Sequence, residues 1–244
     1  MLTKFQSFEP HLLGVVGKPK NLFIPEATQR YPLGARFKYG QRTFHYAYAG
    51  GVALAAGKLV YSTDTPAEAN VTVGTAAAIG ATSIPNITTT AAETALDGGM
   101  MIVNDVAGQG HGYEIQSSSA NADTSTSTDV VLRDPLKIAL TTSSQVELYS
   151  SPYYDLDIAT DVNHLIAGVP IQAVTKNYYF WLQTWGPCSI LIGDTTVAGE
   201  LVGPHTTDGS VGPLTAAATE ASIGKAMTAG TGSEYNGIFL MLVP

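Results

Sequence analysis

The sequence predicts an all-β protein, in which β-barrel or sandwich modules follow a long extended N-terminal arm. From Val60 onward, short segments of alternating apolar and polar residues recur about every dozen residues, with Gly, Asn, Asp or Ser between them. Four prolines occur within the first 32 residues, too densely for helices, and each biases its predecessor toward an extended backbone. A chain of 244 residues can bury a substantial core, as one all-β domain or two smaller ones.

Residues 61–154 are expected to form a first β module. Five strand-like segments follow one another in it: Val71–Val73, Met100–Val103, Tyr113–Gln116, Val130–Leu132 and Val146–Tyr149. Gly108 and Gly110 mark a turn after the second of these segments, because glycine tolerates a positive φ. The stretch Ser117–Thr128 is polar and of low complexity, so it is predicted to be a loop.

The proline-containing connection around residues 149–161 is the expected boundary with a second, barrel-like β module at 155–244. Tyr178–Trp185 carries the strongest strand signal of the chain, and Gly186-Pro187 is predicted to stop it. Further strands are expected at Val169–Val174, Ser189–Ile192, Val197–Val202, Ala216–Met227 and Ile238–Val243. The sequence shows no clean internal repeat.

The first 60 residues are interpreted as an extended arm that lies along another surface. Aromatic residues alternate there with basic residues and prolines, and aromatic and Arg side chains supply most of the binding energy at protein interfaces. The opposing interpretation is that these aromatics pack beneath the chain's own body. The residues expected to contact a capsid protein or a sister subunit are Arg30, Tyr31, Arg36, Phe37, Lys38, Tyr39 and Arg42.

Charge is distributed unequally along the chain. Residues 1–60 contain eight Lys or Arg and two acidic residues, a net charge of +6, whereas the remainder has four basic and eighteen acidic residues, a net charge of −14. A basic segment can bind a polyanion or an acidic protein surface. The basic residues are spaced singly and the acidic body repels a polyanion, so nucleic acid is not an expected partner.

The motifs that usually mark catalysis or metal binding are weak in this sequence. The single cysteine, Cys188, excludes an intrachain disulfide, and within a hydrophobic strand it is expected to be a buried, inert thiol. Asp155, Asp157 and Asp161 resemble part of a calcium loop but lack its Gly and Glu, and a solvated acidic loop is the preferred interpretation. The expectation is therefore a protein that is not an enzyme and has no metal or cofactor.

Composition favours a protein that works within an assembly. Only 13% of the residues are charged, so much of the surface is uncharged and suits repeated protein contacts. The first residues lack an apolar core of signal-peptide length, and no stretch has the character of a membrane span. The sequence predicts a soluble protein made in a cytoplasm, with no membrane partner.

Residues 70–244 resemble a virion structural protein of tailed bacteriophages, most closely a capsid decoration (cement) protein. The resemblance lies in a consecutive series of segments: Gly98–Asp105, Gly108–Ile115, Leu132–Leu136, Ala139–Ser143, Ser151–Tyr153, Asn177–Gly186, Val197–Val202 and Ile223–Ala226. In decoration proteins a strand, a small-residue loop, an Ile/Val-Gly-x-Ala segment and a last strand close a β-barrel, and this chain ends in a similar layout.

The resemblance implies a homo-oligomer, commonly a trimer, seated on the outer shell between subunits of the major capsid protein. The protein would then be located on the virion surface after synthesis in the bacterial host cytoplasm. One alternative is a head- or tail-fibre component that binds host glycans through Tyr178, Trp181 or Trp185, provided that these side chains are exposed. A glycan hydrolase, with two carboxylates about 5–10 Å apart in a cleft, is a third hypothesis.

Overall fold

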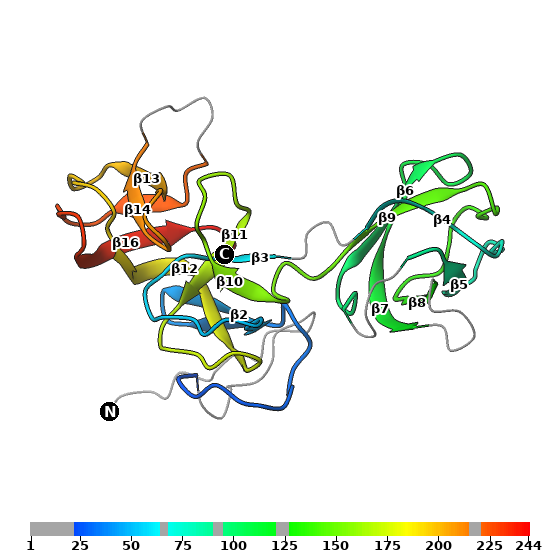
Figure 1. Cartoon of the computed structure of the whole chain (residues 1–244), viewed down its shortest axis with the longest axis horizontal. Coiled ribbons are helices and arrows are strands. Elements are labelled where there is room, and N and C mark those ends of the chain that lie inside the picture. The colour runs from blue at the N-terminus through cyan, green and yellow to red at the C-terminus, as the bar shows by residue number, and fades with distance from the viewer. Residues whose placement is uncertain (1–21, 64–67, 90–94, 121–126, 215–220) are drawn as a thin grey trace, which may run out of the picture.

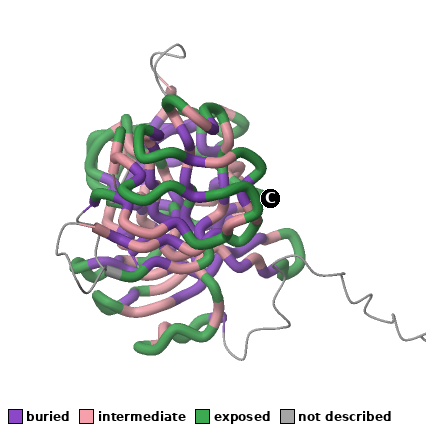
Figure 2. The backbone as a smooth tube through the Cα atoms, turned by 90° about the vertical axis from the view of Figure 1, so that its right-hand side faces the viewer, coloured by how far each residue is buried: buried purple, intermediate pink, exposed green. Residues whose placement is uncertain are grey.

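The computed structural model describes residues 22–63, 68–89, 95–120, 127–214 and 221–244 (Figure 1). Every regular element within these ranges is a β-strand, and the strands form two curled sheets. The all-β prediction is confirmed. In Figure 2, buried residues concentrate inside the curled sheets and exposed residues in the turns.

The larger sheet has ten strands. Eight of them follow the order β10-β3-β11-β12-β16-β15-β13-β14. The other two are β2, which also pairs with β12, and β1, which pairs with β2. Its strands are β1 Arg36–Tyr39, β2 Arg42–Tyr48, β3 Val60–Ser62, β10 Leu156–Ile158, β11 Ile166–Pro170, β12 Tyr179–Leu191, β13 Leu201–Pro204, β14 Val211–Pro213, β15 Gly224–Ala226 and β16 Tyr235–Met241. The long strand β12 lies at its centre, since it pairs with β2, β11 and β16.

The smaller sheet has six strands, in the order β4-β9-β6-β7-β8-β5. Its strands are β4 Glu68–Thr72, β5 Ser83–Ile87, β6 Met100–Asp105, β7 Gly112–Ala120, β8 Thr128–Leu132 and β9 Gln145–Tyr149. It encloses its own core, which includes Ile84, Met101, Ile115 and Leu148. Each of the five strand segments predicted in this region overlaps one of these strands, and β5 is an additional one.

The sheet boundaries differ from the predicted division of the chain. The smaller sheet lies within the predicted first module, but the larger one combines residues 36–62 with residues 156–241. The predicted arm therefore does not extend to residue 60. Its residues 1–21 lie outside the described residues. The expected second module is in turn incomplete without β1, β2 and β3.

Strand β2 is part of the sheet because of its burial pattern. The sequence RTFHYAY is buried at five consecutive positions, on both faces of the strand. Phe44 and Tyr46 point into one apolar cluster and Ala47 into another, so detaching β2 would expose both clusters. Buried aromatics of this kind occur in a central strand as well as in an interface arm, and for β2 the opposing interpretation, packing beneath the chain's own body, is the one that the structure shows.

A structural repeat, not evident in the sequence, organises both sheets. Three antiparallel bridges join Leu54 with Val174, Ala77 with Leu140, and Thr196 with Gly230. In each pair the two residues exchange reciprocal N–H···O bonds of 2.8–3.0 Å. A strand begins five or six residues after each bridge residue. Each sheet, together with its connecting loops, is called a lobe from here on. Each lobe therefore contains paired copies of one bridge–turn–strand unit.

The turn of this unit needs a left-handed residue three positions after the bridge. Five of the six copies have one: Gly57, Gly80, Asn177, Gly199 and Ser233. The N–H of each of these residues donates to a carbonyl four residues before the partner's bridge residue, as from Gly57 to Pro170. Glycine and asparagine tolerate this conformation best, which explains the composition of the turns.

The predicted break at Gly186-Pro187 is wrong, because β12 continues through it. A bulge between Gln183 and Trp185 changes which residues face β2, and Gly186 has a φ of 90°. At the bulge the Thr184 carbonyl accepts a bond from the N–H of Leu242 on the β16 side, whereas farther along the strand Leu191 donates to Gly57 on the opposite edge. Pro187 therefore directs its nitrogen away from β16, to an edge where no ladder bond is required.

Candidate functional site

The predicted contact residues gather on and beside the β1–β2 hairpin. Tyr39 pairs with Arg42 across a two-residue turn, and Arg36 pairs with His45 at the other end. Gly40 has a φ of 60° at the first position of this turn, where a hairpin of this length favours glycine. The short turn fixes the register, so each predicted residue has a defined face.

One face of the hairpin is aromatic and reaches from the core to the surface. Phe37 is buried and stacks on Tyr39 with ring centroids 6.4 Å apart, and Tyr39 is 52% exposed. The guanidinium of Arg42 lies 5.9 Å from the Tyr39 ring and 5.3 Å from the Phe44 ring. These contacts hold the Arg42 cation at the hairpin end by cation–π attraction.

The opposite face of the hairpin contacts the last residues of the chain. Arg36 donates a 3.1 Å hydrogen bond to the main-chain oxygen of Pro244. His45 lies beside Thr184, whose hydroxyl donates to the carbonyl of Val243. Burial, and secondarily the charge of Arg36, lowers the pKa of His45 to about 4. Arg36 therefore has a partner within the chain, and Lys38 on the same face is exposed.

Arg30 and Tyr31 lie on the segment that precedes the hairpin. Arg30 forms a 2.6 Å ion pair with Glu26. The Tyr31 ring packs edge-on against Tyr46, at 5.2 Å, and tilted against Trp181. Tyr31 and Phe37 thus belong to the aromatic cluster under the hairpin. Lys38, Tyr39 and Arg42 form the surface of the hairpin end itself.

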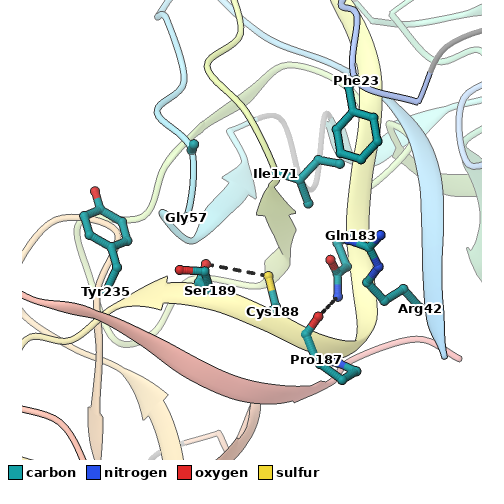
Figure 3. Close-up of a pocket in the computed structure, with 10 residues that line it drawn as sticks. Phe23, Arg42, Gly57, Ile171, Gln183, Pro187, Cys188, Ser189 and Tyr235 are labelled. Atoms are coloured by element: carbon teal, nitrogen blue, oxygen red, sulfur yellow. Dashed lines mark hydrogen bonds between the residues drawn. The ribbon is translucent and has the colours of Figure 1, made fainter.

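A pocket of about 580 Å³ opens next to this surface (Figure 3). Phe23 and Ile171 form one apolar wall and Tyr235 lies at the other end, with β12 between them. Arg42 and Pro187 line both this pocket and the shallow hollow beside the hairpin turn. The hairpin end and the pocket are therefore one continuous surface.

Sequence reasoning missed Gln183, the most unusual side chain of this pocket. It is 1% exposed, and its Nε2 donates to the carbonyls of Trp185, Gly186 and Pro187. Its Oε1 is buried without a hydrogen-bond partner, which is uncommon in folded proteins. A glutamine inside the apolar run Tyr178–Trp185 was the signal that could have singled it out.

The groups considered for catalysis or metal binding are held in structural roles. Burial raises the pKa of the Cys188 thiol to about 12, so the thiol is protonated at neutral pH and a poor nucleophile. Glu114 pairs with Arg133 at 3.0 Å, and His111 contacts the carbonyl of Gly108. Across the described ranges, three or more His, Cys, Asp or Glu side chains do not come together as a metal site, and the Asp155–Asp161 loop is no exception.

The aromatics considered for glycan binding are largely covered. Trp181 is 4% exposed and lies in the cluster under the hairpin. Tyr178 and Trp185 are half-buried, and Trp185 packs edge-on against Phe239. Trp181 therefore stabilises the core.

A second hollow, of about 590 Å³, lies where the two lobes approach each other, and residues of both sheets line it. Arg30, Tyr154 and Tyr179 come from the larger lobe, and Asp97, Glu114 and Arg133 from the smaller one. Its lining is more polar than that of the pocket beside the hairpin.

Within the described residues, no helix is long and apolar enough to cross a membrane. In comparisons with known proteins, no family, no curated protein and no solved structure matched this chain.

Proposed function

We propose that this protein is a non-enzymatic structural component of a tailed-bacteriophage virion, which binds the outer capsid shell and stabilises it. The observation that carries the proposal is the exposed end of the β1–β2 hairpin, where Lys38, Tyr39 and Arg42 surround a tight turn. Tyrosine and arginine on a rigid base are typical anchors of protein interfaces. The resemblance of residues 70–244 to decoration proteins supplies the biological setting.

The charges of the hairpin support a protein partner over a polyanion. Arg30 pairs with Glu26, and Arg36 donates to Pro244, so two of the four predicted basic residues are engaged within the chain. Lys38 and Arg42 remain, on opposite faces of the hairpin. Two separated cations suit individual carboxylates of an acidic protein surface better than a row of phosphates.

Shell stabilisation follows from repetition of a modest contact. If each copy binds its site weakly, an oligomer that occupies several sites gains avidity without a stronger individual contact. The proposed partner is the major capsid protein, and the proposed state is a homo-oligomer, with a trimer favoured by the resemblance. Sedimentation of the isolated protein tests this part, because a strictly monomeric protein would remove the avidity argument.

The test is charge reversal at the hairpin end. The double variant Lys38→Glu/Arg42→Glu should lower occupancy on particles at least tenfold and lower the temperature at which the particles release their genome. Lys137→Glu, an exposed reversal on the smaller lobe, is the matched control and should leave both values unchanged. Equal occupancy of the double variant and the control would reject docking through the hairpin.

The hollow between the lobes favours a second candidate function, a fibre component that binds host glycans. Aromatic faces beside charged and amide groups suit sugar rings, and this hollow offers Tyr154 and Tyr179 beside Arg30 and Gln116. Binding of purified host surface polysaccharide to the wild type and to Tyr154→Ala tests it. Saturable binding that the substitution abolishes would favour this function over shell docking.

A further inference from the structure

Four neighbouring strands of the larger lobe share an apolar outer face. Leu201 of β13 pairs with Lys225 of β15. Phe239 of β16 pairs with Lys225 on one side and with Pro187 of β12 on the other. Directly paired residues point to the same side of a sheet, and their neighbours, such as Ile238, face the core. This outer surface is called the Phe239 face, and its residues are Trp185, Pro187, Leu201, Lys225, Met227, Phe239 and Met241.

The side chains of the Phe239 face are accessible in the single chain. Leu201 is 42% exposed and Met227 is 49% exposed. Trp185, Phe239 and Met241 are half-buried. The outward face of an antiparallel sheet normally carries polar residues where water covers it. A face with this apolar content is therefore expected to lie against another protein surface.

Lys225 determines the chemistry of the surface that covers this face. It is the one charged residue of the Phe239 face, and in the part of the chain that the structure describes no carboxylate lies within ion-pair distance of it. Covering Lys225 without a carboxylate would leave a buried, unpaired charge, which costs free energy. Two copies of the Phe239 face would not supply that carboxylate to each other. The covering surface must therefore bring one.

The smaller lobe of the same chain has an outer face with the complementary chemistry. Across β6 and β9, Met100 pairs with Tyr149. Ile102 pairs with Glu147 two positions along, on the same side, and the alternate residues form the core. Met100 is 41% exposed. The described part of residues 68–149 contains seven Asp or Glu and two Lys or Arg, so this lobe attracts cations. The surface is called the Glu147 face, and its residues are Met100, Ile102, Glu147 and Tyr149.

The carboxylate of Glu147 is fixed in place and can still accept a cation. Its Oε2 accepts a 2.7 Å hydrogen bond from the Tyr149 hydroxyl, and its Oε1 accepts a 3.4 Å bond from Nδ2 of Asn104. A carboxylate accepts about four hydrogen bonds, so capacity remains. Within the described ranges, no Lys or Arg lies within ion-pair distance of Glu147. Because the group is already ordered, pairing it with a cation costs little further ordering.

We propose that the Phe239 face of one copy binds the Glu147 face of a second copy, with Lys225 paired to Glu147. The apolar side chains of the two faces pack as two facing sheets do. Because the contact joins two different surfaces, copies associate head to tail, and the assembly closes into a ring where the rotation between copies permits. The hairpin end with Lys38 and Arg42 takes no part in this contact and remains available to the shell.

The inference rests on the proposed function for the homo-oligomer, and it adds the two surfaces that form it. Association is measured on the isolated protein and shell docking on particles, so the two can fail separately. If Lys225→Glu leaves association unchanged while Lys38→Glu/Arg42→Glu lowers particle occupancy, only this inference fails. If association depends on Lys225 but the hairpin variant keeps its occupancy, only docking through the hairpin fails.

The test is a charge exchange, read out by sedimentation of the full chain over a range of concentrations. Lys225→Glu and Glu147→Lys should each raise the dissociation constant of the oligomer at least about tenfold, because like charges then face each other. The double variant Lys225→Glu/Glu147→Lys should return to within about threefold of the wild type, since the pair is restored with its charges exchanged. Lys176→Glu, at an exposed lysine outside both faces, is the matched control and should change nothing.

A second substitution tests the apolar part of the contact without changing a charge. Leu201→Asn should weaken association roughly tenfold, whereas Leu165→Asn, at a leucine that is 69% exposed outside both faces, should not. If Glu147→Lys does not fold, Lys225→Glu and Leu201→Asn carry the test. A monomeric wild type, an oligomer indifferent to these two substitutions, or a charge exchange without recovery would overturn the proposal. Leu201→Asn that lowers particle occupancy but not association would also overturn it, because the shell would then cover the Phe239 face.

Discussion

The Nδ1 atom of His45 lies 2.9 Å from Oγ1 of Thr184, in the buried contact between β2 and β12. The Thr184 hydroxyl donates its single proton to the carbonyl of Val243, at 2.7 Å, so the imidazole must be the donor to Thr184. His45 also stacks on Tyr153 with ring centroids 4.8 Å apart. The folded protein therefore holds a neutral His45 protonated at Nδ1, and this links the base of the hairpin to the end of the chain.

Protonation of His45 predicts loss of stability in mild acid. Its pKa is lowered from 6.5 to about 4 in the folded chain, so between these values the unfolded chain binds a proton that the folded chain does not. The free energy of unfolding is therefore not reduced by this group above about pH 6.5. As the pH falls from 6.5 toward 4, the free energy of unfolding decreases by up to ~3 kcal/mol. Urea unfolding between pH 4 and 8 measures this slope. His45→Gln should flatten it, and identical slopes in both proteins would contradict the assignment.

Two glycines of the repeated turn should respond differently to alanine. Gly57 has a φ of 71°, and an added Cβ would lie 2.7 Å from the Tyr235 ring and 3.0 Å from the carbonyl of Ser189. Gly80 has a φ of 87°, with nothing within 4 Å of an added Cβ. Gly80→Ala should cost about 1 kcal/mol of backbone strain, and Gly57→Ala at least ~2 kcal/mol because steric overlap is added. Urea midpoints compare them, and equal losses would show that the contact is absent.

Relief of strain at Val106 should stabilise the smaller lobe. Val106 has a φ of 63°, an unfavourable conformation for a β-branched residue, and is 50% exposed, so little packing compensates. Val106→Asn should raise the free energy of unfolding by about 0.5–1 kcal/mol. Val52→Asn, at another exposed valine without a positive φ, is the control and should give no gain. A loss of stability in Val106→Asn would mean that the valine makes a contact of its own.

The thiol of Cys188 should react only after the protein opens. Burial raises its pKa to about 12, and the side chain is 8% exposed. At pH 7.5 a disulfide reagent should label the native protein far more slowly than the urea-unfolded protein, since the thiolate is the reactive form. The single cysteine gives one unambiguous signal. Rapid stoichiometric labelling of the native chain would show that the pocket wall opens readily.

The local alternation of the smaller sheet predicted its strands well, because these strands bury one face and expose the other. The pattern VELY in β9, for example, alternates as the structure does. β2 and β12 were harder, because central strands buried on both faces lose that alternation. Only the fold reveals that residues 43–48 pair with residues 179–185, more than 130 positions apart in sequence.

The contact surface at the end of the β1–β2 hairpin was only partly predictable from the sequence. Composition pointed to the right segment of the chain, but it could not separate exposed Tyr39 from buried Phe37, two positions away. That distinction depends on Trp181, which covers Phe37 and comes from a distant strand.

The most direct measurement is an electron cryo-microscopy map of particles that carry this protein. The proposed function predicts it on the outer shell, with the turn of Lys38, Tyr39 and Arg42 against an acidic surface of the major capsid protein. A map in which that turn faces solvent, with another surface on the shell, would contradict docking through the hairpin. Particles that assemble without the protein on their shell would contradict the proposed function as a whole.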